Sequence, residues 1–568
     1  MEAGEILLRS GLLDERKLQL SRDNQRNGAS VLDSAIELGF VTEENALQAV
    51  GEEVGLDFVD LSKHEVDVSL LDNFPQKIIY RNSLFPISRE NGSITVATSD
   101  PFDLYPLDEV GSITGLSVNP VLAGKREIAK LIKDNLGVGS ETVEGLVLAA
   151  EEDTDDAVEL MGDIETDGSE LSEMAQEASV VRLVNEILLE AVDSRASDVH
   201  IESQASGIVI RYRVDGMLHP QPIPPEINRF HLAIISRLKI MSRLNIAEKR
   251  LPQDGRMKLK VHGREVDVRV SVIPMINGES IVMRILDKGA MVFNLRGLGM
   301  SQEVFDTFMD LIKMPHGIVL VTGPTGSGKT TTLYSSLVEI KKPETKIITT
   351  EDPVEYQLEG INQIQVQSKI GLSFAASLRA ILRHDPDVVL VGEIRDKETA
   401  ENAIQASLTG HLVFSTLHTN DAAGAFTRLV DIGVEPFLVA STVEGIMAQR
   451  LVRRLCEDCK ESYKPTEAEI PKDFPRELLD SVNGTILKSV GCRKCRHVGY
   501  TGRSGIYELL VADQELRDIA DRRGSTWEVK QAAIKSGMKT LRQDAYRKVT
   551  EGTTTLEEVE RVTKGDRA

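Results

Sequence analysis

The segment GPTGSGKT has the residue types and the spacing of a phosphate-binding loop. Its three glycines allow backbone conformations that other residues avoid, so that backbone N–H groups can approach the phosphates of a nucleotide. Lys329 would reach the terminal phosphates, and the hydroxyl of Thr330 would ligate Mg²⁺. The residues expected to bind the nucleotide, ATP, are Gly323, Pro324, Thr325, Gly326, Ser327, Gly328, Lys329, Thr330 and Thr331.

Carboxylates follow two apolar segments and are candidates for orienting an attacking water and for holding the metal. Glu351, Asp352 and Glu355 lie in EDPVEY, and Glu393 follows VVLVG. The ends of parallel strands beside a phosphate loop face the ligand, and a carboxylate there can act as a general base. Gly392 occupies the position of a Walker B aspartate, so Glu393 would take that role one residue later. Which of Glu355 and Glu393 is the general base stays open.

Two histidines bracket the apolar segment LVFSTL and are candidates for sensing the nucleotide. A lone histidine is more often structural than functional. We favour a sensor role for His418 and leave the role of His411 open.

All four cysteines of the chain lie in two CxxC pairs, Cys456 with Cys459 and Cys492 with Cys495. In a reducing compartment this pattern favours a metal over disulfides. Four thiolates suit tetrahedral Zn²⁺ and leave no open position for chemistry, so the predicted role is structural. A redox pair or plain buried thiols are the alternatives.

The elements that must position the phosphate loop begin near residue 300. From there on, predicted helices alternate with the β-branched segments HGIVLVTG, KIITTED, DVVLVGE and HLVFSTL. This alternation predicts a parallel sheet covered by helices on both faces. HGIVLVTG runs directly into the glycine loop and a helix, which is the order that a phosphate loop requires. We therefore assign residues 293–568 to an ATPase domain that includes a metal-binding element at 453–500.

Three further regions precede the ATPase domain. Residues 1–135 combine short amphipathic helices, which read as a degenerate tandem repeat with turns at Gly11 and Gly39, with a small α/β part. Residues 136–178 lack Lys and Arg and are rich in carboxylates, which predicts a flexible acidic linker or, alternatively, a docking segment. Residues 179–292 contain one helix followed by alternating strands, which predicts a compact α+β module.

The bulk composition limits the classes of function. The chain has 568 residues, too many for one hydrophobic core, and a formal net charge of −23, which repels a phosphate backbone and argues against helicases and DNA translocases. No apolar run approaches the roughly 18 residues of a membrane span, and the N-terminus lacks a signal peptide. We expect a cytoplasmic protein that reaches a membrane through a partner.

Three segments together resemble the secretion and pilus ATPase family. EDPVEY, LRAILRHDPDVVLVGEIRD and ASLTGHLVFSTLHTNDA are similar to its Asp box, Walker B and His box. The similarity extends from about Ser179 to the C-terminus and is greatest to type II secretion ATPases. It implies a RecA-like P-loop core, a smaller PAS-like α+β domain before it, and a homo-hexamer that binds ATP between the two. Tetracysteine elements occur in the secretion and pilus-extension members of this family but not in its retraction motors.

A site completed between domains needs cations that reach the γ-phosphate from outside the loop. Arg269 and Arg284 match arginines that the family places near the nucleotide, and Arg256 is a third candidate. Exposed strand arginines without a function are the alternative. Subunit contacts are the other roles considered, for Arg379, Arg383 and Arg395.

The resemblance implies that the protein drives pseudopilus assembly in a type II secretion system. It would be peripherally associated with the inner membrane, would dock onto secretion platform proteins through its N-terminal domain, and would bind no nucleic acid. A type IV pilus extension ATPase, a nucleic acid translocase and a regulatory nucleotide switch with little turnover are the alternatives.

The N-terminal repeats resemble repeats that bind cyclic di-GMP in some relatives. Those repeats generally begin with an RLG-type sequence, whereas here the starts read EAGEI and SVLDS, so the arginine is absent and Asp33 replaces the second glycine. Docking onto a membrane partner is therefore favoured over dinucleotide binding, which stays open.

Overall fold

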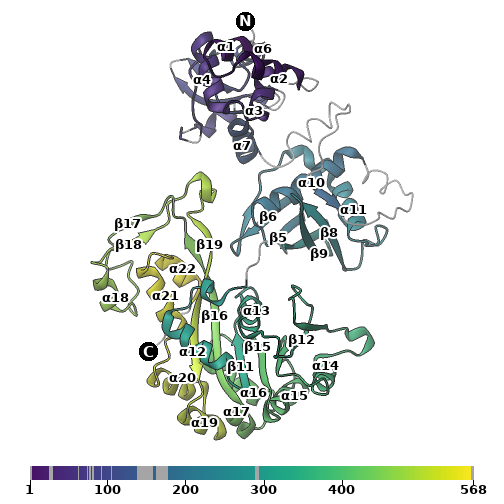
Figure 1. Ribbon diagram of the computed structural model, residues 1–568, viewed down its shortest axis with the longest axis vertical. Helices are drawn as coiled ribbons and strands as arrows, with labels where there is room; N and C mark the ends of the chain where they lie inside the picture. Colours follow the sequence, from purple (N-terminus) through teal and green to yellow (C-terminus); the bar gives the residue numbers. More distant parts are fainter. Residues whose placement is uncertain are drawn as a thin grey trace. The chain divides into compact units, whose positions relative to one another are not determined.

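The computed structural model divides the chain into two compact units, residues 1–287 and 288–568 (Figure 1). The structure describes residues 3–24, 30–61, 63–64, 66–72, 74–75, 78–79, 82–90, 92–103, 105–136, 158–160, 177–287 and 293–563.

Four short helices begin the chain and form two similar helix–turn–helix units. Gly11 and Gly39 occupy the two turns with positive φ values of 72° and 69°, a conformation that glycine adopts at no steric cost. Asp14 and Thr42 then cap the second helix of each unit. The predicted tandem repeat is therefore confirmed. The helices are α1 (Ala3–Arg9), α2 (Glu15–Asp23), α3 (Val31–Glu37) and α4 (Glu43–Val54).

A small α/β part follows these helices, as predicted. Its sheet has the order β1-β2-β3, in which β2 is antiparallel to β1 and parallel to β3. Phe85, Val96, Val110 and Ile128 are fully buried in its core. The elements are η1 (Val68–Asp72), β1 (Phe85–Glu90), β2 (Ser93–Thr98), α6 (Tyr105–Thr114), β3 (Ser117–Leu122) and α7 (Lys125–Leu136).

The predicted α+β module is a seven-stranded sheet, with every pairing antiparallel, that packs against two helices. Its strand order is β4-β8-β9-β10-β5-β6-β7. Alternate residues of β9 are buried because only one face of the sheet meets the core. The elements are α10 (Ala178–Asp193), β5 (Asp198–Gln204), β6 (Gly207–Val214), β7 (Met217–Pro220), η2 (Pro225–Phe230), α11 (His231–Met241), β8 (Gln253–Val261), β9 (Arg264–Met275) and β10 (Gly278–Asp287).

One strand of this sheet comes from the segment predicted to be an acidic linker. β4 (Val158–Leu160) pairs with β8 at the edge of the sheet. At these three residues the segment has a regular partner, which a wholly free tether would lack. Most of the rest of the predicted linker lies outside the described residues.

The C-terminal unit is built on a seven-stranded sheet in the order β13-β12-β14-β15-β11-β16-β19. Six strands are parallel and β19 is antiparallel to β16. The predicted parallel sheet is thus confirmed. Its strands are β11 (Gly317–Thr322), β12 (Ile347–Glu351), β13 (Asn362–Gln365), β14 (Val388–Val391), β15 (Leu412–Leu417), β16 (Val443–Leu455) and β19 (Tyr500–Val511).

Helices cover both faces of this sheet (Figure 1). Successive residues of β11 face opposite cores: Val319 and Val321 pack with α12 and α13, and Leu320 packs with α14, α15 and α16. The helices are α12 (Gln302–Ile312), α13 (Lys329–Ile340), α14 (Phe374–Ile381), α15 (Lys397–Leu408), α16 (Ala422–Asp431) and α17 (Pro436–Thr442).

Two 3-10 helices, η3 (Leu295–Leu298) and η4 (Ser368–Ile370), precede β16, and the remaining elements lie after it. A two-stranded sheet of β17 and β18 belongs to the cysteine-containing segment, and four helices complete the C-terminal unit. Among all described residues, no helix is long and apolar enough to span a membrane. These elements are β17 (Glu461–Tyr463), α18 (Arg476–Ser481), β18 (Ile486–Lys488), η5 (Arg493–Cys495), α19 (Gln514–Asp521), α20 (Thr526–Lys535), α21 (Leu541–Thr550) and α22 (Leu556–Val562).

Candidate nucleotide-binding site and metal centre

The glycine loop connects β11 to α13, as the sequence predicts. Gly323, Gly326 and Gly328 have φ values of 149°, 78° and 90°, so each glycine adopts a conformation that side chains disfavour. The loop ends at the N-terminus of α13, where the free N–H groups and the helix dipole favour an anion. The backbone therefore has the form of a phosphate cradle.

Lys329 and Thr330 begin α13 beside this cradle. The ammonium of Lys329 donates hydrogen bonds to the carbonyl oxygens of Gly323 at 2.8 Å and Pro324 at 3.1 Å. Burial lowers the pKa of Lys329, the charge of Glu393 opposes this effect, and the charge of Arg450 adds to it. Thr330 is exposed in the first turn of the helix, where its hydroxyl is open to a metal ion.

Glu393 and His418 come together at the carboxyl ends of neighbouring strands. Glu393 follows β14 and His418 follows β15, and the two strands pair in parallel. Nε2 of His418 lies 3.4 Å from Oε2 of Glu393, and Nε of Arg395 donates to the same oxygen at 2.5 Å. Because Glu393 also acts electrostatically on Lys329, these predicted residues form one cluster at the loop.

His411 lies at the opposite end of β15 from His418. Its Nδ1 is 2.8 Å from the carbonyl oxygen of Ala406 and 3.1 Å from the hydroxyl of Thr409. These contacts fix the turn before the strand, so the structure gives His411 a local structural role.

The carboxylates after β12 have different environments. Glu351 is buried and accepts hydrogen bonds from Tyr334, from Thr349 at 2.6 Å and from Gln363 at 3.1 Å. Burial beside this carboxylate raises the pKa of Tyr334. Glu351 thus holds α13 and β13 on the sheet, and the half-buried Glu355 remains the other candidate base.

The four cysteines converge as predicted, although the two pairs are separated by 32 residues of sequence. Their sulfur atoms all lie within 4.8 Å of one another, with Sγ–Sγ distances of 3.9 Å from Cys456 to Cys492 and 3.8 Å from Cys459 to Cys495. Zn–S bonds of about 2.3 Å in a tetrahedron separate the sulfurs by about 3.8 Å, so the cluster fits Zn²⁺.

Backbone N–H groups surround these sulfurs and favour the thiolate form that a metal needs. Gly491 donates to Cys459 at 3.3 Å, and Cys492 and Gly499 donate to Cys495 at 3.1 Å and 3.2 Å. Cys456 and Cys495 are buried, which shields the cluster from solvent. The cysteine segment therefore has the donor set and the surroundings of a structural metal centre.

The candidate arginines of the N-terminal unit occupy one row across its sheet. Arg256 is paired in register with Arg269, and Arg269 with Arg284, so the three side chains share a face. Nε of Arg284 contacts Asp198 at 3.2 Å, which orients its guanidinium. A row of cations on an exposed sheet face suits contact with phosphates, but its relation to the loop remains a prediction.

The three other candidate arginines lie in the C-terminal unit and have local partners. Arg379 pairs with Glu398, Arg383 donates to the carbonyl oxygen of Arg379 at 2.7 Å, and Arg395 holds Glu393. Only Arg395 is thereby tied to the predicted site.

Two residues beside the loop carry no sequence motif and escape sequence reasoning. Gln449 bonds the loop at Ser327, and Arg450 acts electrostatically on Lys329. Both lie on β16, more than one hundred residues after the loop, and only the pairing of β16 with β11 brings them there.

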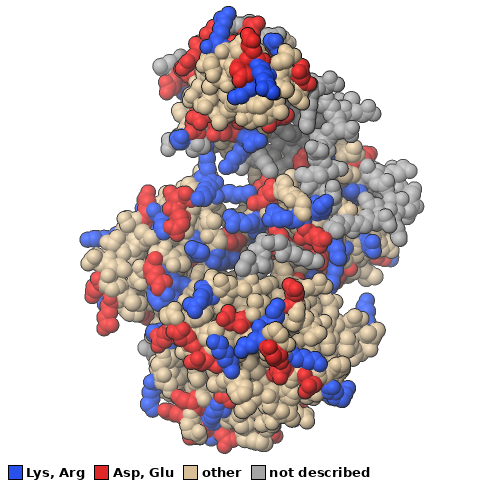
Figure 2. Space-filling model, in the orientation of Figure 1, with Lys and Arg blue, Asp and Glu red and all other residues tan. Residues whose placement is uncertain are grey.

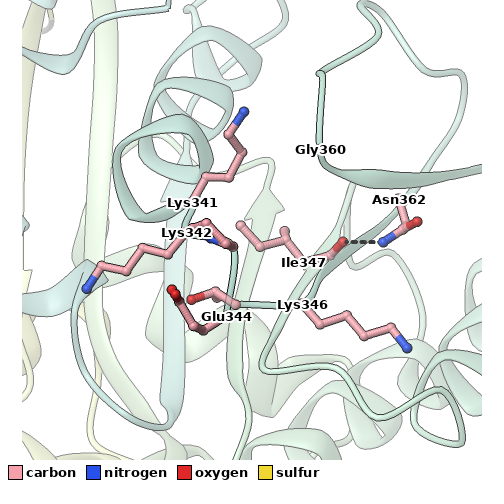
Figure 3. A pocket seen from close by; sticks show the side chains of 9 residues that line it. Lys341, Lys342, Glu344, Lys346, Ile347, Gly360 and Asn362 are labelled. Carbon is pink, nitrogen blue, oxygen red and sulfur yellow. Dashed lines mark hydrogen bonds between the residues drawn. The ribbon is translucent and has the colours of Figure 1, made fainter.

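A hollow of about 580 Å³ lies elsewhere in the C-terminal unit. Ile347, the first residue of β12, lines this hollow, whereas Glu351, the last residue of the same strand, lies near the nucleotide site. The hollow and the nucleotide site therefore lie at opposite ends of β12. Figure 3 shows that Lys341, Lys342 and Lys346 point away from one another, while Asn362 bonds the backbone of Ile347. Because no charges converge in it, the hollow offers no built anion site.

Comparisons with known proteins agree with these observations. The family described as "Type II/IV secretion system protein" matches residues 173–561, and the MshEN domain matches residues 54–142. The chain is 43% identical to Type II secretion system protein E of Xanthomonas campestris pv. campestris over 565 residues, which cover 99% of this chain and 98% of the relative. It is 40% identical over 571 residues to the type IV pilus assembly ATPase PilB of Myxococcus xanthus, with 99% of both chains covered.

One solved structure is similar in fold. The X-ray structure of the ATPase DotB of Legionella pneumophila matches with a TM-score of 0.50 and 23% identity over 66% of this chain and 94% of that chain. At this identity the likeness concerns the fold alone.

Proposed function

Because the chain belongs to the Type II/IV secretion system protein family and is an ATPase, we propose that it is the motor of a type II secretion system. ATP hydrolysis by a homo-hexamer would drive pseudopilus assembly and protein export. The observation that carries this proposal is the cluster of Lys329, Glu393 and His418 at the carboxyl end of a parallel sheet.

The residues of the cluster would have different roles in hydrolysis. The loop N–H groups and Lys329 hold the phosphates, and Mg²⁺ bound by Thr330 would neutralise charge on the transferred group. Glu393 would accept the proton of the attacking water, and its contacts with His418 and Arg395, which would orient the carboxylate, support this role. Glu355 would belong to the metal shell.

We extend the proposal to a site shared between moving parts. Arg269 and Arg284 would bring positive charge to the γ-phosphate from the α+β module, in the manner of arginine fingers. Their shared face and the exposure of Arg284 support this assignment. Hydrolysis would then move the α+β module against the ATPase core.

The cysteine cluster would hold one Zn²⁺ with a structural role. The Sγ–Sγ distances of 3.8 Å and 3.9 Å and the N–H groups directed at the sulfurs support this. Cys456, Cys459, Cys492 and Cys495 would be its ligands.

We further propose that the protein acts in the cytoplasm at the inner membrane and is recruited there by secretion platform proteins. The N-terminal region, which matches the MshEN domain, would dock onto these partners. On the face visible in Figure 2, basic and acidic side chains of the described residues are interspersed over the C-terminal unit. This mixture suits protein contacts better than a nucleic acid backbone.

A type IV pilus extension motor is the second candidate, favoured by the 40% identity to PilB over 99% of the chain. A strain that lacks the gene separates the two. Loss of exoprotein export with normal surface pili in electron micrographs is the expected result. Loss of pili with normal export would contradict the role in secretion and support the role in pilus extension.

ATPase assays test the two remaining alternatives. The rate of hydrolysis is expected to be independent of added DNA, and stimulation by DNA would favour a translocase. A regulatory switch predicts equally slow rates for wild type and Glu393→Gln, whereas a motor predicts a marked loss in the variant.

A further inference from the structure

Gln449 lies behind the phosphate loop and contacts it through a buried side chain. Only 1% of this residue is exposed. Its Nε2 donates to the carbonyl oxygen of Ser327 at 2.7 Å, and its Oε1 accepts from the hydroxyl of Thr332 at 2.9 Å. One carboxamide therefore joins the last turn of the loop to the first turns of α13.

The hydrogen bond to Ser327 has a geometric consequence for phosphate binding. In a trans peptide the C=O and the following N–H point in opposite directions. When Gln449 holds the carbonyl of Ser327 toward β16, the N–H of Gly328 is directed to the other side of the same peptide plane. Gln449 thus sets the direction of one of the N–H groups that form the cradle.

The loop also packs closely on the backbone of Gln449. A Cβ atom at Gly323 would lie 2.6 Å from its carbonyl oxygen, and a Cβ at Gly328 would lie 3.1 Å from its Nε2. The first of these distances is sterically forbidden and the second is very tight. The approach to Gln449 therefore requires glycine at position 323, and at Gly328 it adds a tight contact to the constraint set by the positive φ value.

Arg450, the next residue of β16, extends from the loop to the segment that carries His418. Its Nη1 donates to the carbonyl oxygen of Gln449 at 3.0 Å, and its Nη2 donates to the carbonyl oxygen of Asn420 at 2.8 Å. Arg450 is half-buried, and this burial lowers the pKa of its guanidinium. Asn420 is two residues after His418 in the chain.

We propose that Gln449 and Arg450 are positioning residues for ATP hydrolysis. Gln449 fixes the phosphate loop in its binding conformation, and Arg450 holds the segment after β15 so that His418 stays on Glu393. The two residues are adjacent in one strand, and they therefore fix the position of the phosphate cradle relative to the catalytic cluster. This inference rests on the proposed role of Glu393 and His418 in hydrolysis.

The first test replaces Gln449 and measures nucleotide affinity. Gln449→Met removes both hydrogen bonds without adding charge, and we expect about a tenfold increase in the Kd for Mg-ADP. Gln449→Glu keeps the acceptor for Thr332 and the size of the side chain, and it is expected to weaken binding at least as much. Thr332→Val is the matched control, because it removes the other hydrogen bond of Gln449 and leaves the one to Ser327, and its Kd should stay within about threefold of wild type.

The second test replaces Arg450 and compares turnover with affinity. Arg450→Gln is expected to lower kcat about tenfold or more while the Kd for Mg-ADP changes less than about threefold. Arg453→Gln is the control on the same strand, since Arg453 pairs with the buried Glu558 away from the loop. The control should lower Tm but leave kcat and Kd of the folded protein unchanged.

Wild-type hydrolysis is measured first. If the wild-type protein does not hydrolyse ATP, the proposed function itself is contradicted, whatever the variants do. Given active wild type, a folded Gln449→Glu or Gln449→Met protein with unchanged Kd overturns the role of Gln449. If Arg450→Gln and Arg453→Gln change Tm, kcat and Kd equally, Arg450 has only a structural role and its positioning role is overturned. If one of the two Gln449 variants does not fold, the Kd of the other variant decides. If neither variant folds, Gln449 has a general structural role and the proposed specific role in the loop is overturned.

Discussion

At the scale of single residues, Glu393 and Lys329 lie at one site but are expected to act on different steps. Glu393 contacts His418 and Arg395, whereas Lys329 lies on the carbonyl oxygens of its own loop. In the proposed mechanism the lysine would contact the phosphates in the bound ground state, and the carboxylate would act only when water attacks. Substitution of the two residues should therefore separate binding from chemistry.

Glu393→Gln is predicted to lower kcat by a factor on the order of 10² or more, with little change in KM, because the amide cannot accept the proton of water. Lys329→Ala is predicted to abolish measurable nucleotide binding. Steady-state hydrolysis and equilibrium binding of Mg-ADP measure the two effects. If Glu355→Gln lowers kcat more than Glu393→Gln does, the general base is Glu355.

Glu508 on β19 is a buried carboxyl that makes stability depend on pH. It accepts the N–H groups of Ala422 at 2.8 Å and Leu541 at 3.3 Å at the starts of two helices. Burial, with the nearby Asp421, nevertheless raises its pKa to about 7 from an ordinary 4.5. Between pH 4.5 and 7 the folded chain therefore holds a proton that the unfolded chain has lost, so the free energy of unfolding falls as pH rises through this window.

Glu508→Gln is predicted to remove this dependence. From pH 5 to pH 8 the wild type should lose stability relative to the variant, by at most on the order of 3 kcal/mol, because each pKa unit corresponds to about 1.4 kcal/mol. Thermal unfolding of both proteins at several pH values measures the difference in Tm. Parallel pH curves for the two proteins would contradict the prediction.

At the scale of secondary structure, the predictable strands of the C-terminal sheet are those buried on both faces. β11, β12, β14 and β15 are rich in apolar and β-branched residues, are buried at every position and were all predicted. The sequence NQIQ of β13 lacks this signal because the strand lies at an edge and is only partly buried. β16 and β19 were also missed.

The same reasoning explains which site residues could be predicted. Lys329 belongs to the loop motif itself, and Glu393 and His418 directly follow predictable strands. Gln449 and Arg450 lie on β16, where neither a motif nor a spacing relates them to the loop. Only the register that pairs Thr322 of β11 with Ala448 of β16 brings them to the site.

The cysteine element also depends on contacts between residues that are distant in sequence. Its four cysteines must come together to hold a segment that has little hydrophobic core of its own. Its regular structure consists of the short β17 and β18, α18 and η5. Metal ligation is therefore expected to supply much of its stability.

Metal removal is predicted to unfold this element while the nucleotide site persists. The native protein should contain about one Zn²⁺ per chain, and Cys492→Ser should lose it and lower Tm by at least about 5 °C. Metal analysis and calorimetry measure both effects. Hydrolysis per folded chain should change less than about twofold, since the cysteines belong to a separate segment from the phosphate loop. A zinc-free wild type would leave the thiols without a metal role.

At the scale of the whole molecule, the question is whether one chain contains a complete active site. The C-terminal unit supplies the loop and its carboxylates, but the row of Arg256, Arg269 and Arg284 belongs to the N-terminal unit. A ring of identical subunits can complete each site with residues from two chains when its interfaces are heterologous. Such a site makes a quantitative prediction for mixed assemblies.

Lys329→Ala removes the loop contribution, and Arg284→Ala removes an arginine of the other unit, so each variant alone should be inactive. If the loop of one chain works with Arg284 of its neighbour, equal random mixing leaves about a quarter of the sites with both residues intact. Co-expressed variants with distinguishable tags, purified through both tags, should therefore recover up to about a quarter of the wild-type rate of hydrolysis. If Arg284 instead serves the loop of its own chain, no intact site can form and the mixture stays inactive. Co-expression of Lys329→Ala with Glu393→Gln is the control, because both residues belong to the same unit and mixing cannot restore a site.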